Sequence, residues 1–407
     1  MPLPFHHLFS VVLALVFMLF LSNSTIAATD TYEKAIHQAM TTLYGLDYDH
    51  AAVELEHAIA MQPQNPRGYL YLSSCYWMQI LYLQNKFLST LFAMPPDPYG
   101  TPPNDSSQPK LREQFEDAIR RMKEKSEAMI QAQPKNAEGY FWLGMAEGSE
   151  AVFTIVVDKK LFGAKAHGDK SFDLMEQAAK LDPNFKDPFF SMGMHMHLLG
   201  TRGFLTRVLL KMMGYRVSKE EGRRFVRLAS EEGRYVKDDA RLGLILCYVR
   251  EGNWKEAVNT MQVVFKKFPQ NSLLGVAMGR LQAGIADNSG AASTFRQILQ
   301  RIEQQQPGYQ VVSRGEIQLR LTLVLLAGGQ KQQALVEAEK AVKDPAASLV
   351  VRAAANLTLG QTRDLLQNRK GAIAAYQTVL ALEPITPSHE KARQYLEHPY
   401  DGKVPAG

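Results

Sequence analysis

Residues 238–271 read DDARLGLILCYVREGNWKEAVNTMQVVFKKFPQN, and this stretch is the clearest guide to the architecture of the chain. Its first half has the apolar pattern of a helix and ends in the polar turn 250–253, while its second half is a second helix pattern that ends at Pro269. Small side chains such as Ala257 fall where the two helices would cross, and they let the helix axes approach closely. Proline cannot continue a helix. The stretch therefore predicts two antiparallel helices joined by a tight turn.

The same arrangement of small residues and a terminal proline recurs along the chain. Second helices that end at a proline are predicted at 48–63, 171–183 and 371–384, and another with the same small residues, Ala334 and Ala338, at 329–341. First helices open at 65–76, 136–144 and 189–196, with a further unit at 278–295. A pair of this kind cannot bury its apolar face alone, so it implies stacked neighbours. The sequence predicts an all-α superhelix, or solenoid, of about eight helix pairs with insertions.

Several positions of the first stretch match a known repeat. Tyr248, Gly252, Trp254, Ala257 and Pro269 stand where a tetratricopeptide repeat (TPR) has its consensus residues. The chain resembles the TPR family over about residues 31–384, which places a TPR solenoid at 29–386 with its most regular repeats at 238–271 and 347–384. The resemblance implies a scaffold that binds other proteins. Residues 184–271 also resemble a group of exported bacterial TPR proteins, through Asp187-Pro188, a glycine-containing helix, an insertion and then Glu232-Gly233-Arg234-Tyr235.

Three segments break the repeat spacing. Residues 94–110 are rich in proline and predict a long loop, while 152–169 and 200–218 lengthen the third and fourth units. Insertions in solenoids usually lie on one face or fill the groove. After the last repeat, residues 387–407 predict a polar capping helix over 388–398 followed by a frayed tail.

The N-terminal segment predicts export. Residues 1–28 contain no Lys, Arg, Asp or Glu, and the apolar run 8–21 is interrupted only by Ser10. The run is short for a membrane span, which needs about 20 residues, and Ala27 or Ala28 supplies a small residue for signal peptidase. We expect a signal peptide at 1–28 and a mature protein in the periplasm or cell envelope of a bacterium. A retained N-terminal anchor is the alternative.

The resemblance also implies which residues face the concave groove. In TPR proteins the first helices line it, and carrying their groove positions over gives the predicted partner-binding residues Leu70, Trp77, Phe141, Met145, Phe190, Met194, His197, Leu242, Leu246 and Arg250, with Met78 and Val249 as further groove positions. This set is mostly apolar and lacks the basic and Asn pattern with which family members bind carboxylates. An apolar groove suits an amphipathic helix or an extended apolar segment of a protein partner. Alternatively, the insertions of the chain itself cover the groove, because an exposed apolar strip favours aggregation.

Residues 203–214 predict an amphipathic basic helix. One face carries Phe204, Leu205, Val208, Leu209, Met212 and Met213, and another carries Arg207 and Lys211. Such a helix can lie on an anionic membrane surface, which gives peripheral membrane association as an alternative function. It can equally pack on neighbouring repeats while the two charges reach solvent.

Other function classes find little support. The net charge of +5 comes from 46 basic and 41 acidic residues that are spread along the chain, so no nucleic-acid footprint is expected. The sequence has no HExxH, GxSxG, phosphate-binding glycine loop or CxxC motif, and no enzyme activity or cofactor is expected.

Metal binding is also not expected. The run Met192–His197 offers copper ligands, but the repeat phase puts Met192 and Met196 in packing positions and points His195 and His197 to different sides of a helix. Cys75 and Cys247 fall in different repeats, too far apart for a disulfide, and we expect both to act as small apolar packing residues.

Overall fold

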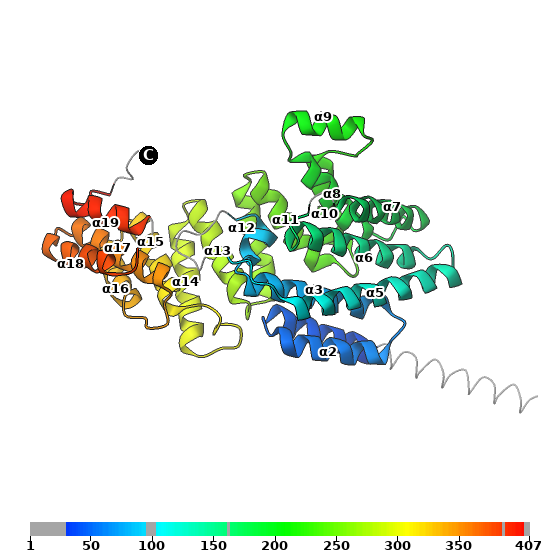
Figure 1. Ribbon diagram of the computed structural model, residues 1–407, viewed down its shortest axis with the longest axis horizontal. Helices are drawn as coiled ribbons and strands as arrows, with labels where there is room; N and C mark the ends of the chain where they lie inside the picture. Colours follow the sequence, from blue (N-terminus) through cyan, green and yellow to red (C-terminus); the bar gives the residue numbers. More distant parts are fainter. Residues whose placement is uncertain (1–29, 95–102, 161–162, 385–386, 403–407) are drawn as a thin grey trace, which may run out of the picture.

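The chain folds into an elongated array of helices. The computed structural model describes residues 30–94, 103–160, 163–384 and 387–402, and within these residues it contains helices and no strand (Figure 1). The predicted signal peptide at 1–28, residues 95–102 of the proline-rich insertion and the last residues of the tail lie outside this range. No helix in the described part of the chain combines the length and the apolar composition needed to cross a membrane.

Eight antiparallel helix pairs follow one another in the described residues, so the prediction of an all-α solenoid is confirmed. In chain order the pairs are residues 30–44 with α2 (Tyr48–Met61), α3 (Pro66–Leu83) with α5 (Pro109–Ala132), α6 (Ala137–Val156) with α7 (Lys165–Leu181), α8 (Pro188–Gly200) with α10 (Lys219–Glu232), α11 (Lys237–Arg250) with α12 (Trp254–Lys267), α13 (Ser272–Gly284) with α14 (Asn288–Glu303), α15 (Arg314–Ala327) with α16 (Lys331–Ala341), and α17 (Leu349–Leu365) with α18 (Arg369–Ala381). Helix α19 (Ser388–Glu397) packs on the last pair, where Tyr395 lies against Tyr376.

Asparagine marks the start of several first helices. The side chains of Asn65, Asn136 and Asn271 each accept a backbone N–H from the first turn of α3, α6 and α13, respectively. These caps satisfy amide groups that have no partner inside the helix. Because the preceding helix has just ended near a proline, the short segments around residues 63–65, 134–136 and 269–271 both stop one helix and start the next.

The insertions sit between the two helices of a pair. In the second pair, residues 84–108 contain the short helix α4 (Phe87–Phe92), which the sequence analysis did not anticipate and whose Phe87 and Phe92 are buried. In the third pair α6 continues to Val156, so the connection proper is 157–164. In the fourth pair the insertion contains α9 (Phe204–Met212), which projects from the body of the array (Figure 1).

Helices α8 and α10 cross closely at two glycines. A Cβ atom on Gly193 would lie 2.6 Å from the carbonyl oxygen of Gly222, and a Cβ on Gly222 would lie 2.5 Å from the backbone nitrogen of His197. Only hydrogen fits at either position, so the two backbones are in direct contact. This crossing fixes the base from which the 200–218 insertion extends.

The N-terminal helix at 30–44 packs against the repeat at 238–271. The rings of Tyr44 and Phe268 stack with centroids 4.0 Å apart, and the side-chain amide of Gln270 donates to the carbonyl of Thr41, 229 positions away in the chain, at 3.2 Å. One hydrophobic cluster accordingly extends from Tyr32 to Leu281. The first five pairs thus close on themselves, and we call residues 30–271 the closed region.

The Glu-Gly-Arg-Tyr motif forms the turn between α10 and α11. The carboxylate of Asp187, which is 1% exposed and directly precedes α8, accepts the backbone N–H groups of Arg234 (2.9 Å), Tyr235 (2.6 Å) and Val236 (2.9 Å). Three amide groups without helical partners are therefore satisfied by one buried side chain. The Asp187-Pro188 and Glu232–Tyr235 motifs, which are far apart in the sequence, are therefore joined by hydrogen bonds into a single unit.

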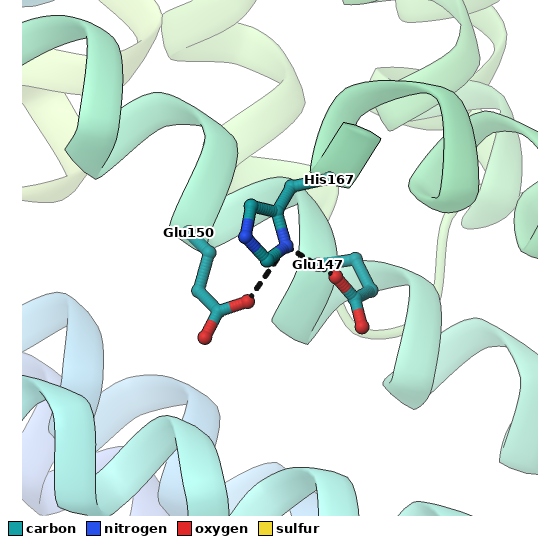
Figure 2. Close-up of side chains that lie close together, drawn as sticks. All are labelled: Glu147, Glu150 and His167. Carbon is teal, nitrogen blue, oxygen red and sulfur yellow. Dashed lines mark hydrogen bonds and ion pairs between the residues drawn. The ribbon is translucent and has the colours of Figure 1, made fainter. Parts of the chain in front are cut away.

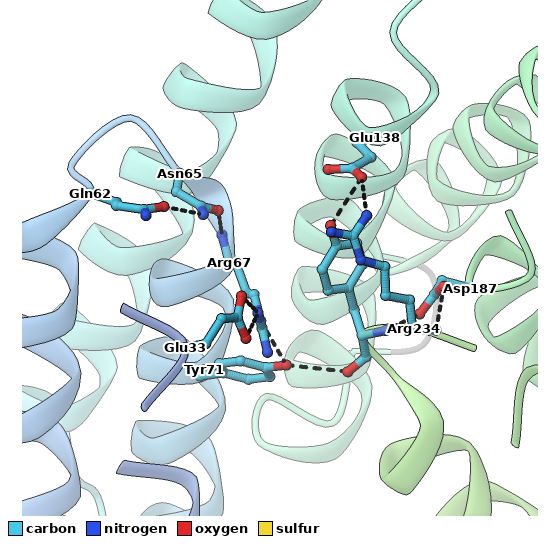
Figure 3. Close-up of polar contacts among 9 residues, drawn as sticks. Glu33, Gln62, Asn65, Arg67, Tyr71, Glu138, Asp187 and Arg234 are labelled. Carbon is cyan, nitrogen blue, oxygen red and sulfur yellow. Dashed lines mark hydrogen bonds and ion pairs between the residues drawn. The ribbon is translucent and has the colours of Figure 1, made fainter. Parts of the chain in front are cut away.

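Tyr235 connects this unit to the first pairs, and Figure 3 shows the partner side chains Tyr71 and Glu138 together with Asp187 and Arg234. Its hydroxyl donates to Glu138 at 3.0 Å, and its carbonyl accepts the Tyr71 hydroxyl at 3.2 Å. Next to Tyr71, Arg67 forms an ion pair with Glu33 at 2.7 Å and lies 5.3 Å from the centroid of the Tyr235 ring. Helices α3, α6 and α8 and the helix at 30–44 are thereby tied together.

Candidate functional site

Half of the twelve predicted groove residues are covered by the chain itself. Leu70, Phe141, His197 and Leu242 are buried, as are the neighbouring groove positions Met78 and Val249. The expectation that they line an open groove needs correction. Because the closed region folds back on itself, these side chains contact other parts of the same chain and have no surface left for a partner.

The covering groups can be identified for two of them. The Phe141 ring lies edge-on to Phe185 with centroids 5.1 Å apart, and the Tyr235 ring covers it at 6.3 Å. Leu242 lines a small apolar cavity of about 10 Å³ together with residues of the helix at 30–44 and of α4, among them Tyr44 and Phe92. A cavity of this size holds one water molecule at most. The closed region leaves no room for a ligand here.

The remaining groove residues keep part of their surface. Trp77, Met145, Phe190, Met194 and Leu246 are half-buried, and Arg250 is exposed. Met145, Met194 and Leu246 occupy equivalent positions in α6, α8 and α11, the first helices of three successive pairs. Stacking of the pairs therefore places these three apolar side chains along one side of the array.

Helix α9 has the most exposed apolar surface of the predicted sites. Phe204, Leu205 and Met212 are 69%, 81% and 81% exposed, and Val208, Leu209 and Met213 are exposed as well. None of its nine residues is buried. The predicted amphipathic helix therefore forms, but its apolar face does not pack on the neighbouring repeats.

The orientation of α9 follows from the residues that are half-buried. Within α9 these are Arg207 and Leu210, while Lys211 is exposed. At 100° per residue, Leu210 and the centre of the apolar face around Met212 lie on opposite sides of the helix. The apolar face is thus turned away from the body of the array. Helix α9 itself stands apart from the other helices in Figure 1.

The segment around α9 carries charge of one sign. From Pro188 to Lys219 the chain has no Asp or Glu, and it carries the five basic residues Arg202, Arg207, Lys211, Arg216 and Lys219. Only two of these basic residues, Arg207 and Lys211, lie inside the predicted helix. The absence of Asp and Glu between residues 188 and 219 is visible in the sequence, and it would have revealed all five basic residues as one positively charged segment.

A second cluster joins Glu147, Glu150 and His167, as Figure 2 shows. Nδ1 of His167 on α7 lies 2.7 Å from an oxygen of Glu147 and 2.9 Å from an oxygen of Glu150, both on α6. These ligand atoms are close enough together to hold a metal ion. The spacing of these three residues does not predict the cluster, because it does not show that α7 returns along α6.

Two lysines form ion pairs with the carboxylate of Glu147 in this cluster. Lys123 on α5 and Lys170 on α7 reach Glu147 at 2.9 and 2.8 Å. Burial opposes ionisation of Glu147, but hydrogen bonds from His167, Lys170 and Lys123 outweigh it and lower the pKa to about 2. The two ammonium groups would repel a divalent cation. The chemistry of the cluster is that of a salt-bridge network that holds α5, α6 and α7 together.

The run Met192–His197 does not assemble a cluster of ligands. The His195 ring packs against Phe172, with centroids 5.3 Å apart, whereas Nε2 of His197 lies 3.0 Å from Glu251. Met192 and Met196 are buried in packing positions. Cys75 and Cys247 are free and buried, as expected for packing residues.

Comparison with known proteins supports the repeat assignment. Residues 239–271 match the family model described as tetratricopeptide repeat. No curated protein matches the chain.

Among solved structures, the chain is similar to TTC0263, a thermophilic TPR protein of Thermus thermophilus (14% identity, TM-score 0.34, 62% of this chain and 99% of that chain). It is also similar to yeast Tom70 (11%, 0.32, 89% and 87%) and to a tetratricopeptide repeat protein from Parabacteroides merdae (13%, 0.27, 81% and 99%). Similarity at this level says nothing about partners. The chain is therefore a solenoid of helix pairs that contains a tetratricopeptide repeat at residues 239–271.

Proposed function

We propose that this protein is a non-enzymatic scaffold of the bacterial cell envelope that binds a protein partner on the concave side of its solenoid. Arrays of tetratricopeptide repeats generally bind proteins. The observation that carries the proposal is the row of half-buried apolar side chains Met145, Met194 and Leu246 on three successive first helices. The closed region holds these helices rigidly, so little conformational entropy is lost when a partner binds.

The partner that fits this surface is an amphipathic helix or an extended apolar segment. The row is narrow because the adjacent groove positions, such as Phe141 and Leu242, are covered. Methionine side chains adapt to different partner shapes. Exposed Arg250 beyond Leu246 offers a charge at the end of the row, which favours a segment with an acidic residue at one end.

Site-specific photocrosslinking in cells tests this proposal. A photoreactive amino acid is placed at Met194 or Leu246, and matched controls carry it at Val263 and Val336, which are exposed on the second helices α12 and α16. We expect one crosslinked protein at the first two positions that is absent from the controls and is lost in a Met194→Glu variant. Equal crosslinking at all four positions would refute groove binding.

The location in the envelope rests on residues 1–28, whose apolar run ends in small residues. We propose that this segment is removed during export and that the mature chain begins after Ala27 or Ala28. Sequencing of the N-terminus of protein isolated from the envelope tests this proposal. A chain that still begins at Met1 and cofractionates with membranes would instead identify the segment as an anchor.

A second candidate function is peripheral membrane association through α9, and the exposed apolar face of this helix favours it. Exposed apolar surface of this kind marks interaction sites. The occupant we propose is an anionic membrane surface, because the segment 188–219 carries five basic residues and no acidic one. Such a helix lies in the interface with its apolar face towards the acyl chains and its basic residues at the level of the headgroups.

Vesicle flotation of the mature chain tests the second candidate. We expect binding to vesicles of phosphatidylcholine with phosphatidylglycerol and weak binding to phosphatidylcholine alone. A Val208→Asp, Leu209→Asp variant should lose this binding, whereas Val263→Asp, a change at an equally exposed valine on α12, should retain it. Flotation that is unchanged in the α9 variant, or absent from the wild type, would eliminate this candidate.

A further inference from the structure

A cavity of about 260 Å³ that is open to solvent lies at the base of α9, where four helices meet. Its walls include Thr201 and Arg202 after α8, Arg207 on α9, Lys219 at the start of α10, and Arg250 and Glu251 at the end of α11. The 200–218 insertion and the repeat at 238–271 therefore contribute to one site. Of the residues around this cavity, only Arg250 at its edge belongs to the partner-binding surface proposed above.

The charge of the cavity is strongly positive. Four of its side chains are cationic, and its single carboxylate, Glu251, is already paired with Arg223 and lies 3.0 Å from Nε2 of His197. Arg202 and Arg207 have no ion-pair partner among the described residues, and Nε of Arg207 is buried without a hydrogen-bond partner. Lys219 reaches only the neighbouring Glu220, at 3.8 Å. The cations are held together without enough negative charge to balance them.

Nearby groups respond to this positive field. Although part of the Arg250 side chain is exposed, desolvation beside the cavity and the charge of Arg202 lower the pKa of Arg250. Burial, together with Arg250, Arg223 and Lys219, lowers the pKa of His197 to about 4. The fully buried imidazole therefore stays neutral next to the cavity at neutral pH. An anion bound in the cavity would relieve the repulsion between these groups.

We propose that the cavity binds the phosphate group of an anionic phospholipid whose acyl chains lie along the apolar face of α9. Guanidinium groups hold phosphate through paired hydrogen bonds, while an ammonium group acts as a point charge. Arg202, Arg207 and Arg250 supply the first kind of group and Lys219 the second. The Thr201 hydroxyl, which donates to the carbonyl of Leu198 at 3.1 Å, accepts from Arg250 at 3.3 Å and so positions that guanidinium group.

The cavity for the headgroup phosphate and the apolar face for the acyl chains lie next to each other on α9. Arg207 and exposed Phe204 are three residues apart and so are neighbours on the helix surface. A headgroup phosphate in the cavity thus places the acyl chains next to Phe204 and the rest of the apolar face. This inference rests on the second candidate function and adds a specific headgroup site to it.

Charge-conserving substitutions separate this site from general attraction to a membrane. Arg202→Lys with Arg250→Lys retains the net charge but removes two guanidinium groups from the cavity. The matched control, Arg224→Lys with Arg314→Lys, makes the same change at two exposed arginines outside both the cavity and the basic segment 188–219. Thermal melts verify that both variants fold. We expect the cavity variant to bind phosphatidylglycerol vesicles at least about tenfold more weakly than the wild type, and the control variant to bind normally.

The other outcomes distinguish the two proposals. If the cavity variant binds as tightly as the wild type while Val208→Asp, Leu209→Asp does not bind, membrane association stands and the headgroup site is wrong. If the wild type does not bind vesicles, both proposals fall. If inorganic phosphate alone stabilises the wild type and not the cavity variant, and vesicles are not bound, the cavity takes a soluble phosphate and the assignment to a lipid is overturned.

Discussion

The two ends of the solenoid are built in different ways. The closed region, residues 30–271, is held by one hydrophobic cluster that is rich in aromatic rings, joins segments far apart in sequence and continues into α13 as far as Leu281. The remainder, residues 272–402, which we call the open region, contains four smaller clusters. Leu88 of α4 packs against the first of them, and the other three are shared by helices that are close in sequence. Alanines such as Ala338, Ala355 and Ala372 provide much of its packing.

This difference shows what the insertions do. A regular solenoid is held together by contacts between neighbouring pairs, and its stability is a sum over those contacts. In the closed region, α4 and the turn at 233–236 add contacts between pairs that are not neighbours. The same contacts fill part of the concave groove, so that part is not available to a partner. We expect the closed region to unfold as a unit and the open region to unfold pair by pair.

The largest effect is expected from Asp187→Ala. This change removes the acceptor of the N–H groups of residues 234–236 and leaves buried donors unsatisfied. We expect a loss of about 3 to 5 kcal/mol in the free energy of unfolding of the closed region, measured by chemical denaturation. Asp173→Ala, at an exposed position on α7, is the control and should change little. A loss below about 1 kcal/mol would show that the turn does not hold the region closed.

The next effect is expected from Gly360→Ala in the open region. The added Cβ would lie 2.3 Å from Cε1 of Tyr376, whose fully buried ring is fixed by its hydrogen bond to Asp364 at 2.9 Å. Overpacking of this kind costs about 1 to 3 kcal/mol. Hydrogen exchange should increase in α17, α18 and α19 only.

The control for this experiment is Gly284→Ala, since a Cβ there meets nothing within 4 Å. This variant should be unchanged or slightly stabilised. If Gly360→Ala also increases exchange in α3 to α12, the two regions unfold together, and the distinction between a closed and an open region fails.

A pH-dependent effect of about 1 to 3 kcal/mol is expected at the contact between the N-terminal helix and α11. Burial and the neighbouring Asp238 raise the pKa of Asp239 from 3.8 to about 7, and the Tyr44 hydroxyl lies 3.4 Å from its carboxyl group. The folded state thus keeps the proton that the unfolded state releases near pH 4. Stability contributed by this group is present below about pH 4 and is lost as the pH rises to about 7.

Asp239→Asn tests this effect, because the amide cannot ionise. The free energy of unfolding of the variant relative to the wild type should rise between about pH 4 and pH 7. Contributions from other groups, such as His197, are common to both proteins and cancel. Asp173→Asn, at an exposed carboxylate on α7 that does not contribute to the pKa of Asp239, is the control. Parallel pH profiles for Asp239→Asn and the wild type would contradict the prediction.

The smallest effect is expected from Leu205→Ser with Met212→Ser on α9. Both side chains are 81% exposed, so their removal should change the free energy of unfolding by less than about 0.5 kcal/mol. Thermal melting in the absence of lipid is the measurement. A loss of more than about 1 kcal/mol would mean that α9 packs on the body and belongs to the closed region.

How far the fold could be predicted depends on local signals. Asn65, Asn136 and Asn271 after a helix-ending proline mark the pair boundaries, and these signals involve only a few adjacent residues. Helix α4 was missed because its six residues are too few to show a clear period. Its formation depends on the burial of Phe87 and Phe92, a tertiary effect.

The candidate sites were predicted less completely, for a related reason. The groove positions follow from repeat phase, but the burial of Leu70, Phe141, His197 and Leu242 depends on segments that return from elsewhere in the chain. The cavity between Arg202, Arg207, Lys219 and Arg250 likewise joins an insertion to a distant repeat. Repeat phase contains no information about either contact.

Helix periods, caps and terminal prolines act over a few residues at a time, so the amino-acid sequence was enough to establish that this chain forms stacked helix pairs. The same local signals established an amphipathic helix within residues 203–214. The closure of the first five pairs and the exposure of the apolar face of α9 became evident only in three dimensions. Those outcomes depend on whether distant segments meet, and the meeting of Tyr44 with Phe268 or of Tyr71 with Tyr235 leaves no periodic signal in the sequence.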